Sequence, residues 1–106
     1  MKHTLESYAS ALSALGHDAR LCIFRLLVRA GDDGLIVGEL IVATGLPAST
    51  LAHHLKTLVS AGLIVQERDG REVRSRVDFD AVRQTIGFLT SECCTGVTLE
   101  NREEAI

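Results

Sequence analysis

The chain has 106 residues, of which 46% are apolar, 4% are aromatic and none is Trp, and its formal net charge is −3. This length and apolar content suit one small globular domain with its own core. No apolar run reaches the roughly 18 residues of a membrane span, and the first ten residues lack the apolar stretch of a signal peptide. We therefore expect a cytoplasmic protein, without the aromatic platform that stacks on single-stranded nucleic acid.

The charges are distributed unevenly along the chain. Five basic and three acidic residues lie between positions 48 and 77, a local balance of +2, whereas six acidic and two basic residues lie from position 78 onward. A basic segment beside an acidic end is compatible with nucleic-acid binding despite the negative total.

Two helices are predicted at the start of the chain. Residues 5–15 have a helical apolar period that Gly16 ends, and residues 18–30 have a broader apolar face that closes before Gly31. The broader face predicts the more deeply buried helix. The two apolar faces consist of Leu5, Tyr8, Ala9, Leu12 and Leu15, and of Leu21, Ile23, Phe24, Leu27 and Val28.

A helix-turn-helix unit is predicted next. After a turn at 31–34 and a short apolar run that suits a small strand, residues 38–44 form one or two helical turns that end at Gly45. A helix of about four turns follows within residues 46–62, with Pro47 at its first position, where a missing N–H is harmless. Its inward residues are predicted to be Leu51, Leu55, Leu58 and Val59.

A β-hairpin and a final helix complete the pattern. Alternating apolar residues predict strands near 63–68 and 73–78, joined by an Asp-Gly turn. Residues 80–94 regain the helical period, with Asp78 or Asp80 as the N-cap. Val82, Ile86, Leu89 and Cys93 share one face of this helix, so the adjacent Cys93 and Cys94 are expected at its end.

This order of elements is that of a winged helix-turn-helix domain, a mainly α fold with a small β-hairpin. The stretches "LGHDARLCIFRLL", "GLPASTLAHHLKTLVSAGLI" and "ERDGREVRSRV" resemble the ArsR/SmtB family of bacterial metal- and thiol-responsive repressors, over roughly residues 5–96. The resemblance implies a homodimer formed through the first and last helices. We expect a winged domain over residues 1–96 and a short, acidic, flexible tail over 97–106.

The DNA contacts expected of such a domain fall into two groups. Outward side chains near the start of the recognition helix meet base edges in the major groove, and wing cations meet backbone phosphates of a palindromic operator. The alternative interpretation is an ordinary solvated helix and turn, or a surface that binds another protein. The candidate DNA-binding residues are Ala48, Ser49, Thr50, Ala52, His53, His54, Lys56, Arg68, Arg71, Arg74 and Arg76, with His54 and Lys56 expected to meet phosphate or to pack.

Two metal sites that the resemblance suggests are missing from this sequence. The first helix of the helix-turn-helix unit reads "GLIVGELI" where an arsenite-type "CVC" cluster would lie, so it has no thiol. A zinc-type site on the last helix uses Asp and His, but residues 78–106 contain no His. We therefore expect neither site.

The thiol pair Cys93–Cys94 is the remaining candidate site, because thiolates select soft, thiophilic ions. The ending "FLTSECCTG" resembles arsenite-responsive repressors whose third cysteine follows a few residues later, but no thiol follows here. The third donor is Cys22, an external thiol, or none. With two thiols only, a methylarsenite-type arsenical suits the site, and antimonite follows the same chemistry. No resident cofactor is expected; trivalent arsenic or antimony is the inducer.

Other interpretations of the cysteines stay open. Cys22 shares a stripe of its helix with Asp18, Arg25 and Arg29, which favours a surface position, but a lone helix cysteine is commonly a small core thiol. The adjacent pair is alternatively a redox- or persulfide-responsive switch, or incidental, although a disulfide between neighbours is strained and a helix C-terminus disfavours thiolate. No His or carboxylate pattern around Cys93 and Cys94 indicates catalysis, so we expect no enzyme.

Overall fold

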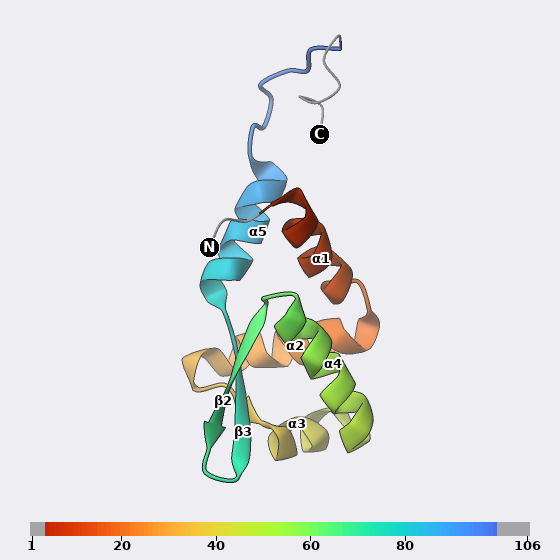
Figure 1. Ribbon diagram of the computed structural model, residues 1–106, viewed down its shortest axis with the longest axis vertical. Coiled ribbons are helices and arrows are strands. Elements are labelled where there is room, and N and C mark those ends of the chain that lie inside the picture. Colours follow the sequence, from red (N-terminus) through yellow and green to blue (C-terminus); the bar gives the residue numbers. More distant parts are fainter. Residues whose placement is uncertain (1–3, 100–106) are drawn as a thin grey trace.

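The computed structural model describes residues 4–99, and Figure 1 shows their arrangement. The helices are α1 (Leu5–Leu15), α2 (Asp18–Ala30), α3 (Val37–Thr44), α4 (Ala48–Ser60) and α5 (Phe79–Thr90), with a 3-10 turn η1 (Gly31–Asp33). The strands are β1 (Leu35–Ile36), β2 (Ile64–Asp69) and β3 (Glu72–Val77). The predicted winged helix-turn-helix order is confirmed, and in the described residues no helix is long and apolar enough to cross a bilayer.

Local signals fix the ends of the first two helices. The Thr4 hydroxyl accepts from the Ser7 backbone N–H at 3.2 Å and caps the start of α1, which ends at Gly16 as predicted. The ring of His17 caps α2, because its Nδ1 accepts from the Ala19 N–H at 3.2 Å. These caps satisfy backbone groups that the first turn of a helix leaves unpaired.

The helix-turn-helix unit is built around a left-handed residue between α3 and α4. Gly45 has a φ of +70° and donates its N–H to the Ile41 carbonyl, so it ends α3 where a residue with a Cβ would be strained. The predicted helix after it begins at Ala48, and Pro47 is its N-cap instead of its first helical residue. The chain thereby turns tightly enough to set α4 across α3.

The sheet has the order β1-β3-β2 and is antiparallel throughout. The hairpin strands are confirmed to within about one residue of the predicted ranges, and the small strand at Leu35–Ile36 pairs with β3. A Cβ on Gly34, which has a φ of +62°, would lie 2.2 Å from the Ser75 carbonyl oxygen. Only glycine permits this close approach of the chain to β3.

The core lies where α1, α2, α3 and α4 meet the base of the hairpin. Leu51, Leu55 and Leu58 of α4 are buried as predicted, but Val59 is 37% exposed. The physical reason is that residue 59 lies about 100° around the helix from Leu58, toward its solvated side. The buried apolar residues are Ala11, Ala14, Ile23, Phe24, Leu27, Leu40, Leu51, Leu55, Leu58, Leu63, Ile64 and Val77.

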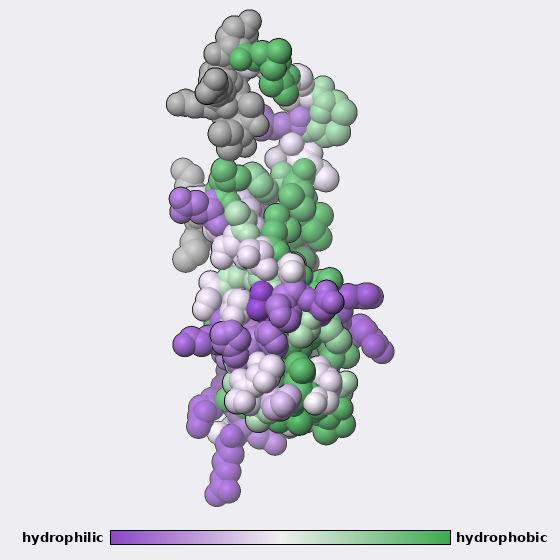
Figure 2. All heavy atoms as spheres, turned by 90° about the vertical axis from the view of Figure 1, so that its right-hand side faces the viewer, coloured by the Kyte–Doolittle hydropathy of each residue, from purple (hydrophilic) through white to green (hydrophobic). Residues whose placement is uncertain are grey.

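The apolar stripes of α1 and α5 are not covered by the rest of the chain. Leu12 is 38% exposed, Ile86 is 59% exposed and Leu89 is 58% exposed. Instead, α1 turns its small residues Ala11 and Ala14 inward. Figure 2 shows apolar side chains gathered at the level of these helices, above the more charged lower body. Within the predicted stripes, Leu15 and Val82 pack against the core, whereas Leu12, Ile86 and Leu89 lie at the surface of the single chain.

The last helix stops earlier than the periodicity predicted. It ends at Thr90, so Cys93 does not extend its apolar face and the cysteine pair lies in the turns that follow. Hydroxyl competition accounts for this end, because the Ser91 side chain donates to the Phe88 carbonyl at 2.8 Å and Thr90 donates to the preceding turn. Of the tail expected at 97–106, residues 100–106 lie outside the described part of the chain.

Candidate DNA interface and thiol pair

The outward face of α4 presents most of the predicted base-contacting residues. The exposed positions on this helix include Ala48, Ser49, Thr50, Ala52, His53 and Lys56. They lie opposite the buried leucines, because residues three and four apart share a face. The hydroxyls of Ser49 and Thr50 and the ring of His53 are the hydrogen-bonding groups among them. Their exposure leaves them available to a groove, and their contacts with DNA stay a prediction.

His54 is a correction to the predicted interface. It is only 7% exposed, because it lies three and four residues from Leu51 and Leu58 on the inward face of α4. Its ring lies 4.9 Å from the ring of His17 and 5.9 Å from that of His53, measured between centroids. His54 was predicted either to contact a phosphate or to pack. Its burial supports packing, so the prediction of a phosphate contact is wrong.

The environment of His54 keeps its ring neutral. Burial lowers the pKa of this imidazole, and the positive potential of His17, Arg20 and His53 lowers it further. Its Nδ1 is buried and has no hydrogen-bond partner within residues 4–99. A proton on this ring would place a charge in a poorly solvated position beside other cations.

The wing arginines divide into two pairs. Arg74 forms an ion pair with Asp69 at 3.3 Å and donates to the Asp33 carbonyl at 3.0 Å, so it ties the wing to η1. Arg76 forms an ion pair with Glu67 across the hairpin. Arg68 and Arg71 are exposed near the tip and have no acidic partner among the described residues. Among the four wing arginines, Arg68 and Arg71 are therefore the two whose charge is not paired with an acidic side chain.

The thiols of Cys93 and Cys94 converge. Their sulfur atoms lie 3.0 Å apart and share a hydrogen bond, and both residues are exposed and unoxidised. The turn that joins them is unusual, because Glu92 and Cys94 both have a positive φ, of 59° and 65°. The hydrogen bond with Cys94 raises the pKa of Cys93, with a smaller contribution from desolvation. An ion that binds both sulfurs must therefore displace thiol protons.

Cys22 lies apart from this pair. It is exposed on α2 in a shallow hollow of about 450 Å³ lined by Leu21, Arg25 and Arg29, so the interpretation of Cys22 as a core thiol is wrong. Within residues 4–99 no three His, Cys, Asp or Glu side chains converge as a metal site. Cys22 is therefore not brought beside Cys93 and Cys94 of the same chain.

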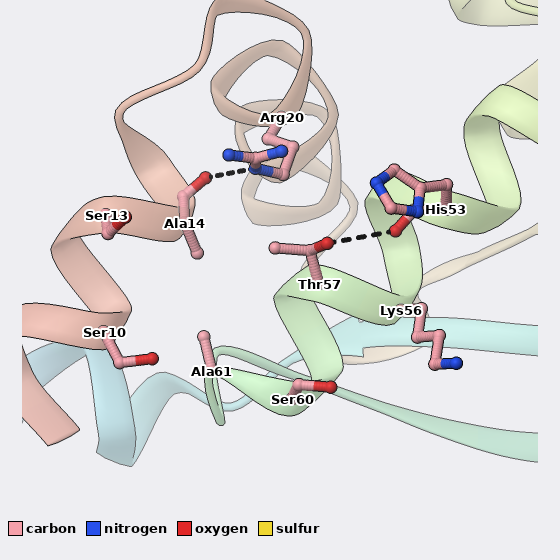
Figure 3. Close-up of a pocket in the computed structure, with 9 residues that line it drawn as sticks. All are labelled: Ser10, Ser13, Ala14, Arg20, His53, Lys56, Thr57, Ser60 and Ala61. Carbon is pink, nitrogen blue, oxygen red and sulfur yellow. Dashed lines mark hydrogen bonds between the residues drawn. The ribbon is translucent and has the colours of Figure 1, made fainter.

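Arg20 is a further cation near α4 that is not among the predicted site residues. Its half-buried side chain donates from Nε to the Ala14 carbonyl at 2.7 Å, at the end of α1. A hollow of about 400 Å³ lies between α1 and α4. Figure 3 draws its lining residues, with Arg20 above the others. The signal was present in the sequence, because Arg20 lies four and seven residues before the buried Phe24 and Leu27 and is therefore a charge on an apolar face.

Comparison with known proteins gives matches along most of the chain. Residues 15–67 match a helix-turn-helix domain family. The HTH-type transcriptional regulator YgaV of Escherichia coli (strain K12) is 33% identical over 94 residues, which cover 89% of this chain and 93% of that protein. A putative arsenical resistance operon repressor ArsR of Halobacterium salinarum is 36% identical over 67 residues, which cover 63% of this chain and 51% of that protein.

A solved structure agrees with the sequence relatives. The homodimeric winged helix-turn-helix DNA-binding domain of a possible ArsR-family transcriptional regulator from Mycobacterium bovis superimposes with a TM-score of 0.68 at 26% identity. The match covers 84% of this chain and 87% of that one. Sequence and fold therefore match the same kind of protein over most of its length.

Proposed function

The chain belongs to the ArsR/SmtB family of winged helix-turn-helix transcriptional regulators, which bind DNA, and we propose that it is a homodimeric repressor released by trivalent arsenic or antimony. The inducer binds Cys93 and Cys94. The observation that carries this proposal is the 3.0 Å separation of two free, exposed sulfur atoms at the end of α5. Two converging soft donors suit a thiophilic ion better than a hard one.

Dimerisation rests on the uncovered apolar stripes of α1 and α5. The two helices lie together in one chain through the stacked rings of Tyr8 and Phe88, whose centroids are 4.2 Å apart. Leu12 of α1 and Ile86 and Leu89 of α5 are exposed apolar side chains on these two helices. A second copy of the chain would bury these side chains against its own α1 and α5. The similar Mycobacterium bovis domain is homodimeric.

DNA binding uses the exposed face of α4 and the two unpaired wing cations. Ser49, Thr50 and His53 meet base edges in the major groove of a palindromic operator, and Lys56 meets the backbone. Arg68 and Arg71 bind phosphates on either side of the wing tip. Arg74 and Arg76 hold the shape of the wing through their ion pairs, so their own phosphate contacts are secondary.

The composition of the inducer site follows from the position of Cys22. Because Cys22 does not join Cys93 and Cys94 within one chain, we propose a two-thiol site. A methylarsenite-type arsenical, which has two exchangeable positions, fits two sulfurs completely. Arsenite and antimonite need a third sulfur from outside the chain, so they bind less tightly unless a small thiol is present.

Release of DNA follows from thermodynamic linkage. An ion across Cys93 and Cys94 replaces their hydrogen bond and alters the turn that ends α5, a helix of the proposed dimer contact. A change there alters the spacing of the two recognition helices, which must match half-sites about one helical turn apart. A coupling of about 1–3 kcal/mol between ion and DNA is sufficient for release.

The test is a DNA-binding titration on palindromic DNA with each candidate ligand. Wild type should release DNA on addition of methylarsenite, arsenite or antimonite, whereas Cys93→Ser/Cys94→Ser should bind DNA normally and stay bound. Cys22→Ser is the matched control and should respond like wild type to methylarsenite. Release of the double variant by arsenicals would refute the site. Release of wild type by persulfide alone would instead support the alternative thiol-responsive repressor.

A further inference from the structure

Most of the residues that line the hollow beside Arg20 have polar side chains. The hollow lies between α1, the start of α2 and α4, and its volume is about 400 Å³. Figure 3 shows α1 on one side and α4 on the other, with Arg20 near the top. Its lining residues are Ser10, Ser13, Ala14, Arg20, His53, Lys56, Thr57, Ser60 and Ala61.

The charge of this hollow is positive, although the chain as a whole is acidic. Arg20 and Lys56 carry full positive charges at neutral pH, and no Asp or Glu is among the lining residues. The hydroxyl groups of Ser10, Ser13 and Ser60 add further hydrogen-bond donors, whereas the Thr57 hydroxyl donates to the His53 carbonyl at 3.2 Å. This set of cations and hydroxyls without a carboxylate is typical of a site for a phosphate-like oxyanion.

One N–H group of the Arg20 guanidinium is bonded, and the others are available to a ligand. The Arg20 Nε donates to the Ala14 carbonyl at 2.7 Å, which fixes the plane of the guanidinium at the rim of the hollow. A guanidinium has five N–H groups, so both terminal nitrogens remain, and within residues 4–99 they have no hydrogen-bond or ion-pair partner. Two terminal N–H groups on a fixed plane suit forked recognition of an oxyanion.

The position of the hollow relates it to DNA. The hairpin flanks one side of α4, where Ala52 and Val59 line a groove with Gln66 and Val73. The Arg20 hollow flanks the other side, where α4 faces α1. A helix in the major groove, which is about 12 Å wide, has a phosphate backbone on each side. The wing therefore serves one backbone, and the hollow is placed beside the other.

We propose that the Arg20 hollow binds an oxyanion, namely a backbone phosphate of the operator on the side of α4 opposite the wing. Arg20 is its principal ligand, with Lys56 supporting it from the recognition helix. This inference rests on the proposed DNA-binding function and adds a second phosphate contact to it. The site positions the protein without selecting sequence, because phosphates are common to all duplexes.

The test compares the salt dependence of DNA affinity for three variants by fluorescence anisotropy. Arg20→Gln removes the principal ligand, and Ser10→Asp places a carboxylate in the hollow without removing the contact to Ala14. Gln84→Asp is the control, because it adds the same charge at an exposed position on α5. Arg20→Gln should reduce the slope of log affinity against log salt by about 0.9, the value for one lost phosphate contact.

Ser10→Asp should weaken binding more than Gln84→Asp, equally on operator and unrelated duplexes. Because Ser10→Asp keeps Arg20 in place, the test holds even if Arg20→Gln fails to fold. Slopes and affinities of both hollow variants equal to the control would overturn the proposal while DNA binding by wild type stands. Failure of wild type to bind DNA would instead refute the proposed function itself.

A second arm separates the two sources of oxyanion. Inorganic phosphate is titrated into the free protein while the Arg20 Nε–H and His53 resonances are followed by NMR. Weak binding that Ser10→Asp abolishes, together with the altered DNA slope, supports the backbone assignment. Phosphate binding in the hollow with unchanged DNA affinity in Ser10→Asp would overturn that assignment in favour of a free anion.

Discussion

The recognition half of the molecule, which consists of α2, α3, α4 and the sheet, differs from the terminal helices α1 and α5 in how its apolar residues are buried. In α4 the leucines at 51, 55 and 58 are at most 3% exposed and the opposite face is polar, so this helix is complete within one chain. In α5 the apolar residues Ile86 and Leu89 are more than half exposed, while the buried position is Thr85. The same amphipathic period therefore marks a core face in one region and an unpartnered surface in the other.

This contrast teaches where each region obtains its stability. The recognition half depends on packing within the chain, so it should fold and present α4 whether or not a second copy is bound. The terminal helices leave apolar side chains that association would cover, and the proposed inducer site at Cys93 and Cys94 follows α5, where a bound ion could disturb that association. Substitutions in the two regions should therefore differ in whether they change folding or assembly.

The largest effect is expected in the recognition half. Leu58 is fully buried, so Leu58→Ala should lower the free energy of unfolding by about 2–5 kcal/mol, the range for a leucine cavity. Val42→Ala is the control, because Val42 is 86% exposed on α3. Urea denaturation measures both. A loss below about 1 kcal/mol at Leu58 would contradict the view that this half is complete in one chain.

The next effect tests the terminal helices. Ile86→Asp should leave the fold of the single chain nearly unchanged but abolish the dimer, because it places a charge in an apolar contact worth about 1.5–3 kcal/mol per buried side chain. Sedimentation equilibrium gives the mass, and circular dichroism gives the helix content. A dimeric Ile86→Asp protein would show that another surface joins the copies.

The parts of the fold that the sequence predicted are those set by short-range signals. Caps, the Gly45 turn and the Asp-Gly turn of the hairpin act over a few residues, so element order and most boundaries were confirmed. The end of α5 was predicted too late. The hydroxyl groups of Thr90 and Ser91 compete with the helix, but in the sequence this signal is less visible than the apolar period that continues to Cys93. Even there the error was only a few residues.

Properties that depend on distant parts of the chain were not predictable. The apolar sequence pattern of α1 or α5 is the same whether the helix packs against its own chain or against a second copy. The ion pairs of Arg74 and Arg76 depend on hairpin register, and the hollow beside Arg20 depends on the packing of α1 against α4. The approach of Cys93 to Cys94 was expected from adjacency alone, but their separation from Cys22 needed the fold.

A smaller effect is expected at the wing. Arg71→Gln should reduce the salt slope of DNA binding by about 0.9, because Arg71 is unpaired and free to meet a phosphate. Arg76→Gln is the matched comparison and should change the slope less, since Glu67 already neutralises that charge. Anisotropy titrations from about 50 to 200 mM salt measure both. Equal slopes for the two variants would remove the distinction between the two pairs of arginines.

The smallest effect is a pH dependence of stability that belongs to the recognition half alone. Burial and the charges of His17, Arg20 and His53 lower the pKa of His54 below its ordinary value of 6.5, so the unfolded chain binds a proton more readily than the folded one. The stabilisation is therefore complete above pH 6.5 and is lost as the pH falls toward the lower, folded-state pKa. His54→Leu should flatten this decline in denaturant titrations at several pH values, whereas His53→Gln should largely retain it, because His53 is exposed and gives only the smallest of the effects on His54. A decline of equal steepness in His54→Leu would mean that groups other than His54 govern the acid sensitivity, and the burial of this ring would then not account for it.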